Sequence, residues 1–378
     1  MTRHRESAAG SSFWQHPLLG SGTRALLAGV RDGGGVSVSR LPDLTAAVGS
    51  SVMRWPARIL QKAIVRRRLA RLGEPPPPIF LIGHWRSGTT HAYNVLSHDP
   101  QFIFPDPLAA GLPGEFMVME RFLRPHMSRL LPGDRWVDAL AVNPDSPQED
   151  EIALANLQPL SFVHAAYFPR RFRELLLRGV FFDGCSEAEI EGWKGSLRDY
   201  LRALWLARGE GTLLVKNPAH TARIGILRDL YPDARFIHLR RNPYDVFRST
   251  LRFWRTMIDQ FAWQDPRSVT DEVVEEVVLE VYARMMGKLL EARDHLPANR
   301  FVEVGLEEME DAPLATVEQI YQTLEIDGLP KARPSLDRYL RSIQSYRKRS
   351  YTPDPRHVSM IQSRWAPFIE AWDYEVPA

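Results

Sequence analysis

The chain of 378 residues has very little cysteine: Cys185 is its only one. A single cysteine excludes an internal disulfide and any metal site built from several cysteines, and it is compatible with a reducing compartment. Long hydrophobic runs are also missing, since no stretch approaches the roughly 18 apolar residues that span a bilayer. The N-terminus lacks the apolar core of a secretory signal. We therefore expect a cytoplasmic protein without a membrane-spanning helix.

A large excess of charge of either sign is absent as well. The chain has 48 Lys and Arg against 46 Asp and Glu, a net charge of +2. This balance gives no reason to expect nucleic acid as a partner. With 44% hydrophobic and 25% charged residues, the composition is that of an ordinary globular protein. It leaves the oligomeric state open.

One stretch near residue 80 predicts a site for an anion. Residues Ile79–Ile82 form an apolar run typical of a buried strand, Gly83–Gly88 predicts a turn, and helical spacing begins at Thr89. A strand, a glycine turn and a helix N-terminus direct free N–H groups at one point. The glycine spacing matches the Walker loop, but Thr89 stands where its lysine would be, and Arg86 carries the charge instead. We expect phosphate binding without Mg²⁺, and we predict no metal site.

Strand and helix patterns alternate along the rest of the chain, which predicts an α/β fold with a parallel β-sheet flanked by helices. Strands are predicted at 79–82, 212–216, 235–239 and 300–304, and helices at 55–72, from 89, at 187–208, at 219–230, from 244 and at 271–296. Ligands of such sheets bind at the carboxyl ends of the strands. Arg86, Lys216 and Arg241 each follow or end a strand, so we expect them to meet in one crevice. Three cations there suit a ligand with several phosphate or sulfate groups.

Two further regions complete the predicted organisation. The prolines of 75–78 mark a boundary between a mostly helical N-terminal extension, 1–77, and the α/β domain, 78–378. Within the extension, Trp55–Leu72 is basic and amphipathic, which fits either a helix on an anionic membrane surface or a helix packed on the domain. Residues 105–147 are rich in Pro and Gly and predict an irregular segment that walls the acceptor pocket.

Two motifs resemble those of sulfotransferases that use 3′-phosphoadenosine 5′-phosphosulfate (PAPS). The sequence WRSGTT at Trp85–Thr90 resembles their 5′-phosphosulfate loop, and RNPYDVFRS at Arg241–Ser249 resembles their 3′-phosphate motif. The chain is most similar to the bacterial branch with GHWRSGTT, PQEDE, HTARI and RNPYDVF-x-ST segments. The resemblance runs from about Pro78 to the end and implies the P-loop-like sulfotransferase fold.

The resemblance implies a role for each matching residue. Those that would bind the 5′-phosphosulfate are Arg86, Ser87, Gly88, Thr89 and Thr90. Those that would bind the 3′-phosphate are Arg241 and Ser249, and the basic run 346–351, with Arg347 and Lys348, is similar in place to a C-terminal phosphate-binding loop. Lys216 resembles the lysine of the tyrosylprotein branch that contacts the bridging oxygen, and it joins Arg86 as a catalytic candidate.

The general base is left open by the sequence. Asp106 aligns with the catalytic glutamate of the tyrosylprotein branch, and Glu149 and Glu151 are rivals. Glu149 and Glu151 also suit a structural place near a helix N-terminus. His84 and His91 flank the loop and are expected to pack rather than react.

The resemblance implies transfer of a sulfuryl group from PAPS to a hydroxyl of a small molecule, lipid or glycan, with release of adenosine 3′,5′-bisphosphate (PAP). A nucleotide-dependent kinase is one alternative, and it would require a lysine after Gly88 and a carboxylate for Mg²⁺. A non-catalytic, membrane-associated binding protein is the other, and the intact Arg86, Lys216 and Arg241 argue against it.

Overall fold

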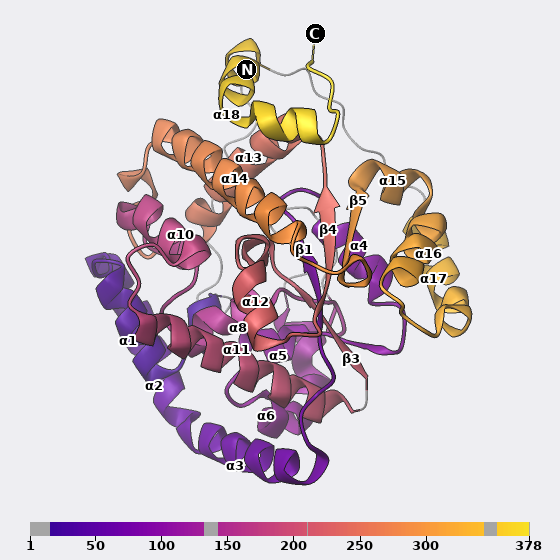
Figure 1. Cartoon of the computed structure of the whole chain (residues 1–378). Coiled ribbons are helices and arrows are strands. Elements are labelled where there is room, and N and C mark those ends of the chain that lie inside the picture. The colour runs from indigo at the N-terminus through magenta and orange to yellow at the C-terminus, as the bar shows by residue number, and fades with distance from the viewer. Residues whose placement is uncertain (1–15, 132–142, 210, 344–353, 378) are drawn as a thin grey trace.

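The computed structural model describes residues 16–131, 143–209, 211–343 and 354–377. A five-stranded sheet lies at its centre, with all strand pairs parallel and the order β2-β3-β1-β4-β5 (Figure 1). The strands are β1 (Ile79–Ile82), β2 (Phe102–Ile103), β3 (Thr212–Lys216), β4 (Arg235–Arg240) and β5 (Phe301–Gly305). The predicted parallel α/β fold is confirmed. The two-residue β2 was not predicted, because so short a run has no readable pattern.

Both faces of the sheet are buried, and alternate residues of β1 show this directly. Ile79 and Leu81 belong to the apolar cluster on one face, whereas Phe80 and Ile82 belong to the cluster on the other. The first face is covered by α4 (Thr89–Leu96), α15 (Leu306–Asp311), α16 (Pro313–Thr323) and α17 (Leu329–Ile343). The second is covered by helices that include α12 (Ile224–Leu230), α13 (Pro243–Phe261), α14 (Asp271–Arg293) and α18 (Pro355–Ala371).

Four helices between β2 and β3 pack around the second face and the edge of the sheet. They are α8 (Asp150–Leu157), α9 (His164–Tyr167), α10 (Phe172–Phe181) and α11 (Glu187–Arg208). Helix α11 has the predicted bounds because Ser186 and Glu189 form a capping box at its start. The predicted helix 219–230 is instead a 3₁₀ turn, Pro218–Ala222, followed by α12. The helix predicted at 271–296 ends earlier, at Arg293.

The segment 105–147 is not irregular over its described part, so that prediction was wrong. It contains α5 (Pro107–Gly111), α6 (Phe116–Leu123) and α7 (Met127–Leu130). Proline was interpreted as a helix breaker, but Pro107 occupies the first turn of α5, where the missing N–H costs nothing. Asp106 caps the same helix by accepting a hydrogen bond from the Ala109 amide at 2.8 Å.

The N-terminal helices α1 (Thr23–Asp32), α2 (Leu41–Met53) and α3 (Trp55–Leu72) run along one side of the molecule, and α3 lies beside α6 and α11 (Figure 1). Helix α3 has the predicted bounds and packs on the domain, but of its apolar stripe Val65 is packed against the core whereas Ile59 and Leu60 are not. Gln61 is the fully buried residue of α3, whereas Ile59 and Leu60 are about half exposed. The domain boundary at residues 77 and 78 stays a prediction.

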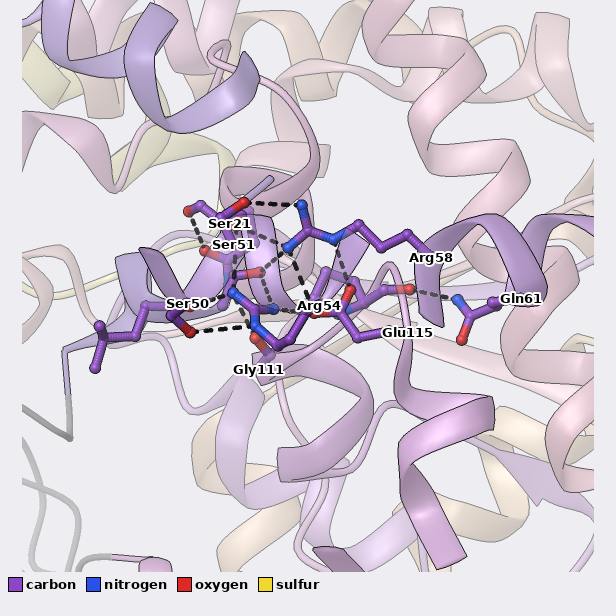
Figure 2. Close-up of polar contacts among 12 residues, drawn as sticks. Ser21, Ser50, Ser51, Arg54, Arg58, Gln61, Gly111 and Glu115 are labelled. Atoms are coloured by element: carbon purple, nitrogen blue, oxygen red, sulfur yellow. Dashed lines mark hydrogen bonds and ion pairs between the residues drawn. The ribbon is translucent and has the colours of Figure 1, made fainter. Parts of the chain in front are cut away.

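A buried carboxylate, Glu115, attaches α3 to the segment before α6 (Figure 2). Arg54 forms an ion pair with it, and Arg58 Nε lies 2.9 Å from Glu115 Oε2. Arg58 also donates to the Ser21 carbonyl at 2.8 Å. Gln61 donates to the Pro113 carbonyl at 2.8 Å. Burial, with a smaller effect of Arg58, lowers the pKa of Arg54 to about 10, so the Arg54 guanidinium stays charged at neutral pH.

We predict that Glu115→Gln destabilises the protein by about 3–5 kcal/mol, because it leaves two poorly solvated guanidinium groups without their carboxylate. The measurement is urea unfolding. Glu74→Gln is the matched control: its carboxylate pairs with Arg202 at the surface, and we expect a change of less than about 1 kcal/mol. Equal effects of the two substitutions would contradict a supporting role for Glu115.

Candidate functional site

The loop between β1 and α4 has a strained, concave backbone. Gly83 and Gly88 have φ values of +144° and +92°, and Arg86 has +69°, which is uncommon outside glycine. A side chain at Gly88 would overlap Leu306, and one at Gly83 would come within 2.5 Å of the Leu239 carbonyl oxygen. Left-handed residues within a short turn direct successive N–H groups inward and create an anion-binding concavity.

Hydrogen bonds hold this loop in place. Ser87 Oγ donates to the His84 carbonyl at 2.8 Å, and the Gly83 amide donates to Thr221 Oγ1 at 2.8 Å. Thr89 and Thr90 begin α4, whose N-cap is Gly88, and no side chain of the described residues caps it. The first N–H groups of α4 are therefore left for a ligand.

Arg86, Arg241 and Ser249 come together beside the loop, although 163 residues separate Arg86 from Ser249. Arg86 Nε donates to Ser249 Oγ at 2.9 Å, and Arg241 Nη1 donates to the Arg86 carbonyl at 2.9 Å. Arg241 also pairs with Asp245 at 3.2 Å. Its Nε is buried and has no hydrogen-bond partner in the described part of the chain. A buried donor of this kind fits an oxygen of a bound anion.

Lys216 ends β3, the strand next to β1, and lies almost wholly out of solvent. Its ammonium group pairs with the carboxylate of Glu149, the N-cap residue of α8. The Glu149 side chain keeps 21% of its surface exposed, so it can meet a molecule that arrives from solvent. A buried ammonium needs such a partner, because an unpaired charge away from water is costly.

A network of fully buried polar groups supports this pair from behind. Asp150 Oδ2 lies 2.9 Å from His220 Nε2. Asn217 donates to Asp150 at 2.9 Å and to Glu151 at 2.7 Å. Glu151 also pairs with Arg223 at 3.4 Å. The sequence analysis gave no role to the residues at 217–223. The signal that could have revealed them is the HTARI segment near Lys216, together with the acids of PQEDE.

The structure distinguishes the three candidate bases. Glu151 has no exposed surface, and Asp106 is only 4% exposed. Asp106 Oδ2 accepts from Arg208 at 2.6 Å and from Arg124 at 3.1 Å, and its other oxygen caps α5. Glu149 is therefore the candidate best placed for an acceptor. The remaining predicted residues, Arg347 and Lys348, lie outside the described residues.

His84 lies inside the loop as a neutral, buried group. Its Nδ1 is 2.9 Å from the Trp85 carbonyl oxygen, which fits an Nδ1–H donor. Burial, partly offset by that hydrogen bond, lowers its pKa to about 4. The packing role expected for His84 agrees with its contacts, since its ring lies edge-on to those of Trp85 and Tyr282.

Fold and site together define an α/β enzyme with a P-loop-like anion cradle. Residues 77–330 match the sequence profile described as the Sulfotransferase family. The chain belongs to the Sulfotransferase family, and the protein is a sulfotransferase. The predicted family and enzyme class are confirmed, and they favour sulfuryl transfer over the kinase and the non-catalytic alternatives.

Relatives and solved structures agree with this assignment. Proteins named omega-hydroxy-beta-dihydromenaquinone-9 sulfotransferase Stf3, from Mycobacterium bovis and Mycobacterium tuberculosis, are each 28% identical over 318 residues, which cover 83% of this chain and 80% of the relative. Sulfotransferase STF9 from Mycobacterium avium has a TM-score of 0.69 at 16% identity, over 95% of this chain and 98% of that one. Sulfotransferase STF1 from Mycobacterium tuberculosis has 0.58 at 18%, over 91% and 90%. These structures share the fold.

Two further findings concern the described residues alone. None of their helices has both the length and the apolar character required to cross a bilayer. No group of three or more His, Cys, Asp or Glu side chains among them is arranged to hold a metal ion. The expectation that catalysis needs no metal stays a prediction.

We predict that acid destabilises the protein through His84. Its folded-state pKa of about 4 lies below the ordinary 6.5, so the folded state binds this proton less readily than the unfolded chain. The stabilisation is complete above pH 6.5 and is lost as the pH falls towards 4, by up to ~3 kcal/mol. Urea unfolding measured between pH 4 and 7 should show a smaller pH dependence for His84→Asn than for the natural protein. If the free energy of unfolding changed equally with pH in both proteins, His84 would not be the group responsible.

Proposed function

We propose that this enzyme transfers the sulfuryl group of PAPS to the hydroxyl of an apolar small molecule or lipid and releases PAP. The observation that carries the proposal is the meeting of Arg86, Arg241 and Ser249 beside the loop, one strand away from Lys216. A donor with a 5′-phosphosulfate and a 3′-phosphate needs two anion sites at the same edge of the sheet.

The residues present fit this donor. The free N–H groups of the loop and of α4 would hold the 5′-phosphosulfate, together with the side chains of Arg86, Ser87, Thr89 and Thr90. Arg241 and Ser249 would hold the 3′-phosphate, and the unpartnered Arg241 Nε supplies a donor for it. Arg347 and Lys348 are proposed as further phosphate ligands, on the resemblance alone.

The chemistry assigns opposite roles to the two members of the Lys216–Glu149 pair. A bond forms from the acceptor oxygen to sulfur, the bond from sulfur to the 5′-phosphate oxygen breaks, and the hydroxyl proton passes to Glu149. Negative charge develops on the leaving oxygen, and Lys216 and Arg86 stabilise it. Such a transition state has little covalent chemistry for the protein to perform, so positioned charges supply the catalysis.

Glu149 is proposed as the base in preference to Asp106, which is occupied by two arginines and by its cap. A phosphosulfate competes with Glu149 for Lys216, so donor binding would separate the pair and leave the Glu149 carboxylate to face the acceptor hydroxyl.

The acceptor is proposed from the relatives, whose name gives the hydroxyl of a dihydromenaquinone as their substrate. We expect the acceptor to be a hydroxylated lipid of this kind. We expect it to bind beside residues 107–130, the described segment that contacts α8. We propose no nucleic-acid partner. We also propose that the protein is cytoplasmic and contacts the membrane peripherally through residues 55–72.

The donor assignment predicts that PAP stabilises the protein far more than adenosine 5′-phosphate. With PAP at about 100 dissociation constants the gain is ~2.7 kcal/mol, which thermal unfolding detects. Arg241→Ala should erase most of the difference between the two nucleotides. Arg235→Ala is the control, because this residue begins β4 at the opposite end of the strand, and it should preserve the difference. Equal stabilisation by both nucleotides would remove the 3′-phosphate site.

The catalytic assignment predicts that Lys216→Met and Glu149→Gln each lower kcat about a hundredfold or more, with a much smaller change in PAPS affinity. The measurement is turnover of labelled PAPS with an acceptor found by screening hydroxylated quinones, lipids and glycans. Asp106→Asn is the comparison. We expect it to lower the stability of the protein and to change kcat per folded molecule far less than Glu149→Gln does. If Asp106→Asn abolished turnover while Glu149→Gln did not, Asp106 would be the base.

A further inference from the structure

A cluster of large apolar side chains is exposed where α2 meets α3. The exposed fractions are 58% for Val52, 81% for Met53, 62% for Trp55, 49% for Ile59 and 51% for Leu60. Only Arg54 separates the two helices, and residues spaced three or four apart share one side of a helix. Single exposed apolar residues are ordinary, but five within nine residues form a patch that marks an interaction site.

The opposite face of α3 explains why this patch cannot turn inward. Arg54 and Arg58 pair with Glu115, and Gln61 donates to the nearby Pro113 carbonyl (Figure 2). Farther along the helix, Arg68 donates to the Leu206 carbonyl at 3.0 Å. These positions, spaced by three, four or seven, form one polar face that packs on the domain. Rolling the helix to bury Ile59 and Leu60 would break this buried charge cluster.

Charge identifies the partner that fits the patch. The sequence between Asp43 and Glu74 contains no acidic residue, and its basic residues are Arg54, Arg58, Lys62, Arg66, Arg67, Arg68 and Arg71. Lys62, Arg66, Arg67 and Arg71 are exposed along α3. An apolar patch with a tryptophan and flanking cations fits the surface of an anionic bilayer. A second copy fits poorly, since a two-fold contact would bring the same cations face to face.

We propose that the α2–α3 junction and the outer face of α3 dock on an anionic lipid bilayer. The patch inserts between headgroups, and the exposed cations of α3 meet lipid phosphates. This surface differs from the apolar stripe read in the sequence, because Val65 is packed against the core and the charge cluster sets the rotation of α3. The proposal adds to the proposed function in one respect: it would place the segment before α6, bonded to Gln61, near a membrane-dissolved acceptor.

The test is co-sedimentation of the full chain with neutral and with anionic phospholipid vesicles, at low and at high salt. We expect binding to anionic vesicles that weakens with salt. Arg66→Gln/Arg67→Gln should weaken it about thirtyfold at low salt, since each basic residue near such a surface contributes about a fivefold factor. Ile59→Ser/Leu60→Ser should weaken it at least tenfold at both salt concentrations.

The matched control is Arg338→Gln/Arg341→Gln, which removes two exposed arginines from α17, on another side of the molecule (Figure 1). It should leave vesicle binding unchanged. All variants change exposed side chains, and thermal unfolding should match that of the natural protein. PAP binding by the same variants is measured in parallel, so that loss of the membrane surface and failure of the donor site are told apart.

Three results would overturn the proposal. The first is no binding to anionic vesicles at low salt, and the second is equal weakening by the α17 control. The third is a concentration-dependent dimer that Ile59→Ser/Leu60→Ser abolishes, which would assign the patch to a second copy of the chain.

Discussion

The site depends on the pairing of buried charged side chains at the carboxyl edge of the sheet. Lys216 is buried at the end of β3, and Glu149 is its partner there. Glu149 is held because the next two residues, Asp150 and Glu151, are themselves tied into the core by Asn217, His220 and Arg223. Removing one member of such a set leaves an uncompensated buried charge, so the set fixes the position of Glu149. In the proposed reaction Glu149 keeps this place, and Lys216 turns from it to the leaving oxygen.

The same physical rule operates at a second place, away from the chemistry. Glu115 holds two arginines of the N-terminal helices, and those arginines fix the rotation of α3. At the start of α3 the packing is the reverse of ordinary amphipathic packing, since the two arginines lie inward whereas Ile59 and Leu60 face solvent. The extension is therefore joined to the domain by buried charge at α3 as well as by apolar contacts, among them those of Leu26 and Ala47.

Much of the fold and of the donor site could be predicted because the signals are local. A glycine turn between an apolar run and a helix, a capping box at Ser186 and apolar strand segments each fix their own neighbourhood. What could not be predicted depends on distant partners. The polar face of α3 requires Glu115, which lies 57 residues from Arg58, and the structural role of Asp106 requires Arg208, 102 residues away. The helix directly after Asp106 was missed because Pro107 starts this helix instead of ending one.

The most direct measurement of the central claim is a crystal structure of the full chain with PAP. The account predicts the 5′-phosphate on the backbone of residues 83–90, the 3′-phosphate on Arg241 and Ser249, and Lys216 turned from Glu149 toward the 5′-phosphate. A nucleotide bound elsewhere, or a 3′-phosphate left in solvent with the Lys216–Glu149 pair intact, would contradict it.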